Sequence, residues 1–397
     1  MSAARNTQPS PGAKRPLRVL MCFRAPLGGL FRHVGDLTQG LVARGAEVGI
    51  ICDAASCGPM SDRRLEELAG ICALGVHRAP MPRLIGLGDA GALRDLYRLV
   101  REFDIDIVHG HGAKGGAYGR VAGRLAGAYT VYTPHGGSLH YSPRSAAGMV
   151  FLNLERALRG LADAVIFESR FSQRAYSQKV GTEPRTSRVI PNGLGATEFQ
   201  PVCAVPGAAD VLFIGEMRTL KGPQILLRAI AEIRKTRKIR ALLVGSGPDL
   251  AQFGQLASDL GIADTVEFRA PMPAREAFAL ARLLVVPSLA ESFPYIVLEA
   301  AAAAVPMIAT DVGGIPEIFG PSSERLIEAG QAGALAQAIC RQLDSPTPQH
   351  GASQLRGYVE ANFTQTAMVN AVAGAYSALL PSHAQAIAPI SAPENAV

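Results

Sequence analysis

The stretch VPSLAESFPYIVLEAAAAAVPMIATDVGGIPE, residues 286–317, decides the fold class of this chain. Its apolar runs and turn residues predict a buried strand, a loop, a helix, a second strand and a glycine-rich loop. Short strands that alternate with helices are typical of a parallel sheet covered on both faces. The stretch therefore predicts an α/β fold, and it places one carboxylate, Glu291, before the helix and another, Glu299, inside its opening turns.

The start of this helix is suited to an anion. We expect Ser292 to cap the helix and Pro294 to be an early helical residue. The free amides of Tyr295 and Ile296 would then face a diphosphate at the positive end of the helix dipole, with Phe293 in the same donor-binding loop. The residues 292–296 are therefore predicted to bind the phosphates of a nucleotide.

The two carboxylates suggest recognition of two polyols. Glu291 would reach a hexose hydroxyl from the loop, and Glu299, about two turns along the helix, would accept hydrogen bonds from both hydroxyls of a ribose. Taken alone, the pair could equally be a loop charge and a solvated helix charge. The flanking sequence decides between these interpretations.

With its flanks, this stretch closely resembles the signature of glycosyltransferase family 4, whose members are retaining enzymes of the GT-B fold. A second block, FIGEMRTLKGP at residues 213–223, follows an apolar run and opens a helix. In the family this block supplies an arginine and a lysine that neutralise the donor diphosphate, and Arg218 and Lys221 match them. The alternative is a pair of surface charges, although cations at a helix start are disfavoured unless an anion is present.

The resemblance implies two doubly wound Rossmann-like domains that face each other across a cleft. We predict an acceptor-side domain at 17–200, a nucleotide-sugar-binding domain at 205–364, and a helix at 365–380 that returns to the first domain. The segments 1–16 and 381–397 are expected to be disordered. Apolar runs predict strands at 18–23, 48–52, 106–109, 129–133, 164–167, 188–190, 211–214, 241–244, 265–268, 283–286 and 307–309.

Glycines follow several of these strands. Gly28 and Gly29, before a helix expected at 30–44, leave room for a phosphate or sugar at the carboxyl edge of the sheet. The alternative is a tight turn between strand and helix, but such a turn needs only one glycine. Gly245 and Gly247 form the equivalent turn of the second domain, which in the family lies by the donor phosphates. Gly313-Gly314 could serve the same site or only make a loop flexible.

Histidines mark the first domain. His135, after a strand, resembles the active-centre histidine of the family, which contacts the transferred sugar. His111 and Lys114 are predicted on the acceptor side. We expect His109 and His111 to point to opposite sides of their strand, and no carboxylate or cysteine stands at ligand spacing, so we predict no metal site.

Two further carboxylates need comment. Asp104 and Asp106 resemble the metal-binding Asp-x-Asp of a different transferase fold, but they precede a strand and are expected to be solvated. A retaining enzyme that works by double displacement needs a carboxylate beneath the anomeric carbon. We expect none at the strand ends of the first domain, and so predict same-face attack assisted by the leaving phosphate.

Charge is divided unevenly. Residues 1–200 hold 25 Lys and Arg against 16 Asp and Glu, whereas the whole chain has a net charge of +6. A basic first domain could attract anionic lipid, a lipid-diphosphate carrier or nucleic acid. Nucleic acid is not expected as a partner, because aromatic content is 6% and no nucleic-acid-binding motif is present.

Localisation is predicted to be cytoplasmic, and peripheral on the inner face of the plasma membrane. No apolar run reaches the roughly 20 residues of a membrane span, no signal peptide is recognised, and the six cysteines form no CxxC pair. Basic and apolar residues suggest an interfacial patch, although the apolar positions could as readily face the core of the first domain. Its predicted members are Arg78, Met81, Arg83, Leu84, Ile85, Leu87, Met149, Leu152, Arg156 and Arg159.

Together these features predict a retaining hexosyltransferase that needs no metal or other cofactor. Its donor would be a nucleotide-diphosphate sugar, and its acceptor a glycan or lipid-linked glycan of surface polysaccharide synthesis. A GT-B-like nucleotide-sugar epimerase and a non-catalytic sugar-nucleotide-binding protein are the alternatives. A dinucleotide-dependent dehydrogenase would need Gly-x-Gly-x-x-Gly after the first strand, and Gly28 and Gly29 do not supply it.

Overall fold

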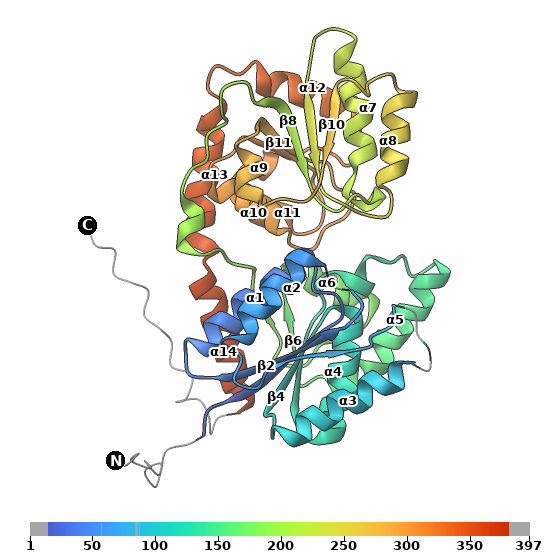
Figure 1. Cartoon of the computed structure of the whole chain (residues 1–397), viewed down its shortest axis with the longest axis vertical. Helices are drawn as coiled ribbons and strands as arrows, with labels where there is room; N and C mark the ends of the chain where they lie inside the picture. Colours follow the sequence, from blue (N-terminus) through green and yellow to red (C-terminus); the bar gives the residue numbers. More distant parts are fainter. Residues whose placement is uncertain (1–14, 57, 84–85, 87, 381–397) are drawn as a thin grey trace, which may run out of the picture.

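The computed structural model describes residues 15–380 except 57, 84–85 and 87, and it shows two α/β domains, one above the other in Figure 1. The predicted disordered segments, 1–16 and 381–397, lie outside the described residues apart from Arg15 and Pro16. The guanidinium of Arg15 lies 2.6 Å from Asp106 and 3.3 Å from Asp104. Asp106 is therefore an anchor for the start of the first strand and not a solvated carboxylate.

The first domain contains a seven-stranded sheet with the order β3-β2-β1-β4-β5-β6-β7. All neighbouring strands are parallel. The order reverses between β1 and β4, which is where ligands bind in doubly wound sheets. The strands are β1 (Arg18–Phe23), β2 (Glu47–Asp53), β3 (Val76–Ala79), β4 (Ile107–His111), β5 (Tyr129–Thr133), β6 (Ala164–Phe167) and β7 (Arg188–Val189).

Six α-helices within residues 28–179 cover this sheet. They are α1 (Gly28–Val42), α2 (Pro59–Ala69), α3 (Gly88–Glu102), α4 (Gly112–Ala126), α5 (Ala146–Leu158) and α6 (Arg170–Lys179). Both α2 and strand β3 fall in a region where the sequence predicted no element. The strand was missed because Val76–Ala79 is short and mostly half-exposed, so it has no continuous apolar run.

The second domain contains a parallel five-stranded sheet with the order β10-β9-β8-β11-β12. Its strands are β8 (Ala209–Ile214), β9 (Ala241–Val244), β10 (Val266–Arg269), β11 (Ala281–Val286) and β12 (Met307–Ala309). Its helices are α7 (Pro223–Arg234), α8 (Leu250–Asp259), α9 (Ala274–Phe278), α10 (Tyr295–Ala302), α11 (Ile315–Phe319), α12 (Ala332–Leu343) and α13 (Pro348–Asn362).

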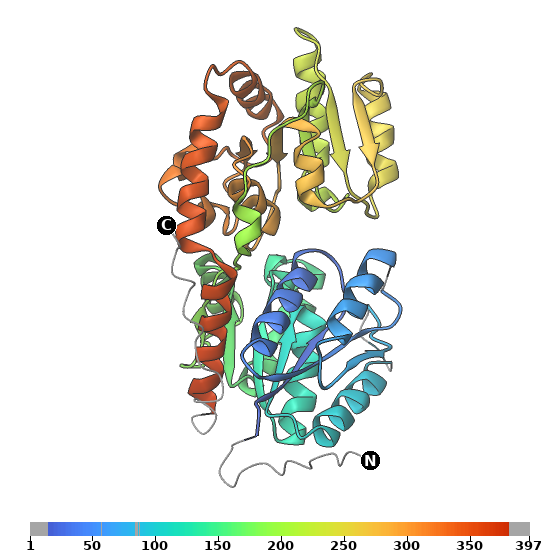
Figure 2. The same ribbon diagram turned by 60° about the vertical axis from the view of Figure 1, so that its left-hand side comes forward.

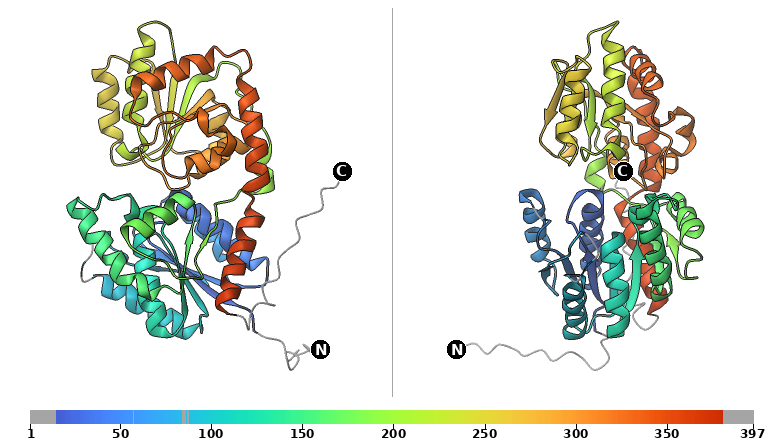
Figure 3. Two further views of the ribbon diagram at one scale, coloured as in Figure 1. Left: turned by 180° about the vertical axis from the view of Figure 1, so that it is seen from behind. Right: turned by 90° about the vertical axis from the view of Figure 1, so that its right-hand side faces the viewer.

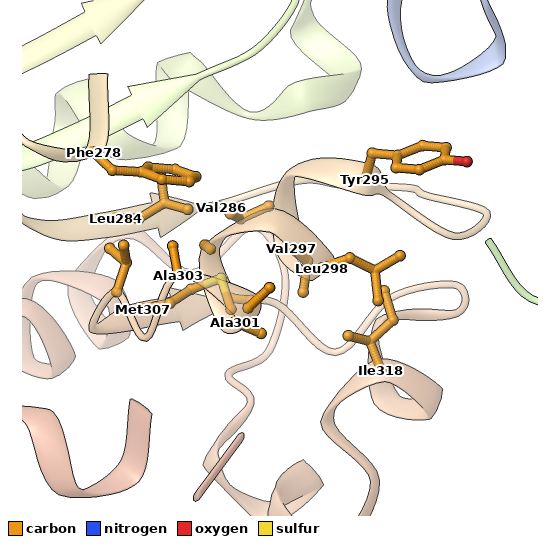
Figure 4. Close-up of a cluster of buried hydrophobic side chains, with 14 of the residues drawn as sticks. Phe278, Leu284, Val286, Tyr295, Val297, Leu298, Ala301, Ala303, Met307 and Ile318 are labelled. Carbon is orange, nitrogen blue, oxygen red and sulfur yellow. The ribbon is translucent and has the colours of Figure 1, made fainter. Parts of the chain in front are cut away.

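Helix α10 lies inside the second domain, where apolar side chains surround it on most sides. Val297, Leu298 and Ala301 pack with Val286 of β11 and Met307 of β12, as Figure 4 shows. All of these side chains are buried. The packing holds α10 rigidly on its sheet, so the first turn of this helix has a fixed position at the carboxyl edge.

The last helix, α14 (Gln365–Leu379), returns to the first domain and lies along α1 in Figures 2 and 3. Val369 and Val372 of α14 join the core formed by β1 and α1. Gly40 makes this approach possible, because a Cβ atom there would lie 2.5 Å from Val369 Cγ2. The two domains are thus joined by a packed helix as well as by the chain.

The two segments that connect the domains run side by side. The amide of Leu194 donates to Phe363 O at 2.9 Å, and the amide of Gln365 donates to Leu194 O at 2.8 Å. These backbone hydrogen bonds tie the two connecting segments to each other.

Within the described residues, no helix is long and apolar enough to cross a membrane. The predicted interfacial patch is wrong in part, since Leu152 and Met81 are buried in the first domain. Met149 is exposed, and Arg78 lies 2.7 Å from Asp62. Leu84, Ile85 and Leu87 lie outside the described residues. Peripheral membrane association stays a prediction that rests on the remaining residues.

Candidate active site

The carboxyl ends of the two sheets meet at the loop Glu291–Pro294, which docks on the first domain. Ser292 Oγ lies 3.5 Å from His140 Nε2, and its carbonyl accepts from Ser169 Oγ at 3.3 Å. The carbonyl of Phe293 accepts from the side chain of Asn192 at 2.9 Å. The loop that carries the predicted donor-binding residues therefore faces the predicted sugar-binding part of the first domain.

Lys221 and Glu291 form the central ion pair of this region. Lys221 ends a short 3-10 turn between β8 and α7, and its Nζ lies 2.7 and 2.8 Å from the two carboxylate oxygens of Glu291. Ser288 Oγ donates to the same carboxylate at 2.8 Å. The predicted diphosphate cation and the predicted hexose-binding carboxylate thus touch each other, and a donor diphosphate would compete with Glu291 for Lys221.

Arg218 precedes the same turn but makes a different contact. Its guanidinium lies 3.2 Å from Glu216 and is about two-fifths exposed. The structure therefore brings Lys221, and not Arg218, to Glu291. Arg218 is free to turn toward a diphosphate on the solvent side of the loop, because a surface pair of this kind is weak.

Glu299 binds a cation from the other domain. Arg32 of α1 donates to Glu299, and its second terminal nitrogen lies 2.6 Å from both carboxylate oxygens of Glu198. The guanidinium stacks on the ring of Tyr295, 4.5 Å from its centroid. Ile296, one residue on, is half-buried. No local sequence pattern indicates Arg32, because the two members of this pair are 267 residues apart.

The first turn of α10 differs from the prediction. The helix begins at Tyr295, Pro294 precedes it with an extended backbone, and no side chain caps it. Ser292 is therefore not the cap: the extended backbone at Pro294 moves the Ser292 hydroxyl away from the helix and toward His140. The amides of Tyr295 and Ile296 still lie in the first turn, where they have no partner within the helix.

Helix α1 begins at Gly28, two residues before the predicted start at residue 30. Gly28 and Gly29 therefore belong to its first turn. A Cβ atom on Gly29 would lie 3.2 Å from Tyr295 Cδ2. This glycine allows the first domain to approach the start of α10 closely.

Glycines of the second domain allow close backbone packing against the segments that bear the charged residues. A Cβ atom on Gly247 would lie 2.5 Å from Met217 O, and one on Gly245 would lie 1.9 Å from Gly215 O. Gly313, with φ +61°, abuts Glu291, whose carbonyl would be 1.8 Å from an added Cβ atom. In this structure Gly313 allows close backbone packing that positions Glu291, and its service to the donor site stays a prediction.

Four histidines lie together at the carboxyl edge of the first sheet. The rings of His109 and His111 have centroids 4.0 Å apart, so the prediction that they point to opposite sides is wrong. Residues i and i+2 of a strand share a face. His111 Nδ1 lies 3.1 Å from His135 Nε2, and the ring of His33 lies 4.9 Å from that of His135.

Burial keeps these imidazoles neutral. It lowers the pKa of His33 to about 4 and lowers the pKa values of His111 and His135 well below the usual range. His33 was missed by the sequence analysis. The signal was available, because His33 follows Gly29 by one helical turn and so lies over the sheet edge at which α1 begins.

Glu168 directly follows β6 and is a second residue that the sequence analysis missed. It is 2% exposed, and burial raises the pKa of its carboxyl to about 7. The hydroxyls of Ser292 and Ser172 and the amide of His135 face this carboxyl and lower the pKa in part. The expectation that no carboxylate lies at the strand ends of the first domain is therefore wrong.

Lys114, predicted on the acceptor side, lies in α4 with its Nζ 2.5 Å from Asp89 of α3. Near this pair, a cavity of about 590 Å³ opens at the carboxyl ends of the outer strands. Arg24, Asp53 and Arg83 are among the residues that line it. The cavity combines cationic and anionic side chains.

Comparisons with known proteins agree with this architecture. A family model described as Glycosyltransferase Family 4 matches residues 27–197, and one described as Glycosyl transferases group 1 matches residues 208–345. The D-inositol 3-phosphate glycosyltransferase of Acidothermus cellulolyticus is 30% identical over 382 residues, which cover 87% of this chain and 83% of that protein.

Solved structures show the same fold. Sucrose-phosphate synthase from Thermosynechococcus elongatus superimposes with a TM-score of 0.78 at 22% identity, covering 93% of this chain and all of that one. Anabaena HepE in complex with UDP and glucose superimposes with a TM-score of 0.76 at 20% identity, covering 91% of this chain and all of that one. The chain belongs to glycosyltransferase family 4 and is a glycosyltransferase of the GT-B fold.

Proposed function

We propose that this glycosyltransferase moves a hexose-type sugar, with retention of configuration, from a nucleoside diphosphate to a glycan or lipid-linked glycan of surface polysaccharide synthesis. The observation that carries the proposal is the pairing of Lys221 with Glu291 beside the His140 region of the first domain. One cation suited to a diphosphate and one carboxylate suited to a hexose lie where both domains contribute residues.

The donor would lie along the edge of the second domain. Lys221, Arg218 and the first-turn amides of α10 would bind the diphosphate, and Glu299 would bind the ribose. When the nucleotide binds, Glu299 would release Arg32 and accept hydrogen bonds from the ribose hydroxyls. Alternatively, it would keep Arg32 on one carboxylate oxygen and accept from the ribose hydroxyls with the other. HepE, which has the same fold, was solved with UDP and glucose, and this supports a nucleotide-sugar donor.

The transfer step we propose is same-face attack. The bond between the anomeric carbon and the phosphate oxygen breaks as the acceptor oxygen bonds to that carbon, and the acceptor proton passes to the leaving phosphate. A covalent intermediate on Glu168 is not favoured, because that carboxyl is 2% exposed and covered by the Ser292 loop. Lys221 and the helix amides would stabilise the departing charge.

The acceptor would bind at the cavity beside Lys114 and Asp89. The guanidinium groups of Arg24 and Arg83 in its lining favour an anionic acceptor. A lipid diphosphate has this chemistry, and so does a phosphorylated polyol. The second candidate deserves a test of its own, because several relatives are D-inositol 3-phosphate glycosyltransferases.

The direct experiment incubates the protein with UDP- and GDP-linked sugars, each with a polyprenyl-diphosphate glycan, with inositol 3-phosphate and without an acceptor. We expect acceptor-dependent release of the nucleoside diphosphate and a product whose anomeric configuration, read by NMR, matches that of the donor. An inverted product would exclude the retaining mechanism. If turnover occurs with inositol 3-phosphate but not with the polyprenyl-diphosphate glycan, the acceptor is a phosphorylated polyol and not a glycan.

Two carboxylate variants test the donor assignment. Glu299→Ala should weaken nucleotide binding by about 10-fold to 100-fold, since a hydrogen bond to a charged group contributes roughly 1.5–3 kcal/mol. Glu291→Ala should chiefly lower kcat through lost sugar positioning. Calorimetry measures the first effect and steady-state kinetics the second. Glu198→Ala is the matched control, because it also breaks a contact of Arg32 but lies outside α10. Wild-type affinity and turnover in both test variants would refute the assignment.

Removal of divalent metal ions should leave transfer intact. The charge that a metal supplies in other transferases is provided here by Lys221, Arg218 and the α10 amides. After dialysis against EDTA, we expect kcat to stay within about twofold of its starting value. Loss of activity on chelation, with recovery on addition of manganese, would instead show that a metal ion takes part.

A further inference from the structure

Three histidines of the first domain come from three different elements and converge on one point. His33 lies in α1, His111 ends β4, and His135 follows β5. One ring nitrogen from each lies within 4.8 Å of the corresponding nitrogens of the other two. This is the only such group of histidine, cysteine and acidic residues found among the described residues. His33 and His111 are 1% exposed, whereas His135 is half-buried and leaves one side of the group open.

The spacing of the nitrogens suits a tetrahedral metal ion. Zinc binds histidine nitrogen at about 2.0–2.1 Å, so two such ligands in a tetrahedral site lie about 3.3 Å apart. His111 Nδ1 and His135 Nε2 are 3.1 Å apart and share a hydrogen bond that a bound ion would replace. Small rotations of the imidazole rings would therefore place the three nitrogens around one ion.

The hydrogen bonds of His33 show which of its nitrogens is available. The Nδ2 group of Asn192 donates to Phe293 O, so Asn192 Oδ1 is the atom that faces His33 Nδ1, at 2.9 Å. Because Oδ1 is an acceptor, Nδ1 must carry the proton and Nε2 must have a lone pair. Within the described part of the chain, the buried Nε2 of His33 has no hydrogen-bond partner.

An imidazole whose second nitrogen is held by an amide carbonyl is the arrangement that metal-binding histidines usually have. The neighbouring His109 contrasts with it. Its Nδ1 contacts the hydroxyl of Tyr376 at 2.6 Å and its Nε2 contacts that of Thr133 at 2.8 Å. Both nitrogens of His109 are thus engaged, and it is not a candidate ligand.

The ligand set narrows the kind of ion. Three neutral imidazoles without a carboxylate or thiolate suit zinc and its late first-row neighbours, and do not suit magnesium or calcium, which prefer oxygen.

We propose that His33, His111 and His135 form a binding site for a zinc-type divalent ion, and that this ion inhibits transfer by excluding the donor sugar. The site is separate from the metal-independent binding of the donor diphosphate by Lys221. The binding of the ion rests only on the three histidines. Its competition with the sugar rests on the proposed function, together with the prediction from the family resemblance that His135 contacts the transferred hexose.

The test begins with Zn²⁺ and Co²⁺ alone, added to the full-length protein. We expect one ion per chain and the visible absorption bands of tetrahedral Co²⁺. His33→Gln and His135→Ala should each weaken binding at least about 100-fold, because loss of an outer partner alone costs about 10-fold to 100-fold. Asn192→Ala, which keeps all three ligands, should show that smaller loss. His135→Ala is at a half-buried position, so it remains informative if His33→Gln fails to fold.

Two controls exclude other sites. His350→Gln removes an exposed histidine of α13 and should leave binding unchanged. Cys203 is an exposed free thiol, and a thiolate-to-Co²⁺ charge-transfer band would place the ion there instead. That band, an absence of stoichiometric binding, or unchanged affinity in the His135→Ala variant would overturn the proposed metal site.

The competition is measured at buffered free Zn²⁺, so that chelation by phosphate does not change the ion concentration. Zinc should raise the apparent Kd of the intact nucleotide sugar but leave that of the bare nucleoside diphosphate nearly unchanged. If zinc binds without this difference, the inhibitory part of the proposal fails and the placement of the sugar at His135 fails with it, while the metal site stands. If zinc does not bind, only the metal site fails.

Discussion

Replacement of Lys221 by alanine is expected to lower kcat by about 100-fold to 1000-fold, the usual cost of removing one group that stabilises developing charge. The ammonium group lies against Glu291, which is buried. Its loss would leave that carboxylate unpaired next to the donor diphosphate, and the two negative charges would repel each other. Both effects act on the departing diphosphate, so kcat should fall more than the affinity for the acceptor.

Steady-state kinetics with saturating acceptor measures this change. Lys221→Arg keeps the charge and should retain most of the activity. Compared with Lys221→Ala, the double variant Lys221→Ala with Glu291→Gln should recover only the part of the lost kcat that arises from repulsion between Glu291 and the diphosphate. Lys235→Ala is the matched control, because it removes an exposed lysine beyond the end of α7 that pairs with Glu232. A Lys221→Ala enzyme with wild-type kcat would remove the diphosphate role from this residue.

Replacement of Arg120 by methionine is expected to destabilise the first domain by about 3–5 kcal/mol, the usual cost of breaking one side of a buried ion pair. Arg120 of α4 lies 2.8 Å from Glu155 of α5, and both side chains are almost fully buried. The same carboxylate accepts from Tyr132 at 2.8 Å and from Ser138 at 2.9 Å. Methionine would leave it without its cation.

The effect should reach the active site, because Ser138 lies three residues after His135 and belongs to the short turn Gly137–His140. Urea denaturation followed by tyrosine fluorescence and circular dichroism measures the change in stability, since the chain has no tryptophan. Arg120→Met with Glu155→Leu should recover much of the loss, since no buried charge remains. Arg124→Met, one turn along α4 at an exposed position, should change stability by less than about 0.5 kcal/mol. An equal effect of both arginine variants would contradict the prediction.

Local sequence patterns predicted most of the architecture. Continuous apolar runs such as Arg18–Phe23 and Ala164–Phe167 became buried parallel strands, because a strand covered on both faces has no polar side. The same reasoning failed for Val76–Ala79, an outer strand that is half-exposed. It also failed for Ser292, because a capping residue is defined by backbone angles, which the sequence does not state.

The sequence by itself determined the fold class, the family, the helix that carries Glu299 and the loops that carry Lys221, Glu291 and His135, since parallel strands place the residues that follow them at one edge of the sheet. Only the tertiary structure decided the pairing of Arg32 with Glu299, the meeting of His33 with His111 and His135, and the position of Glu168 against the Ser292 loop. The physical reason is that these contacts join residues far apart in the chain. They depend on how the two domains dock and on which polar side chains become buried. Neither is a property of a local sequence pattern.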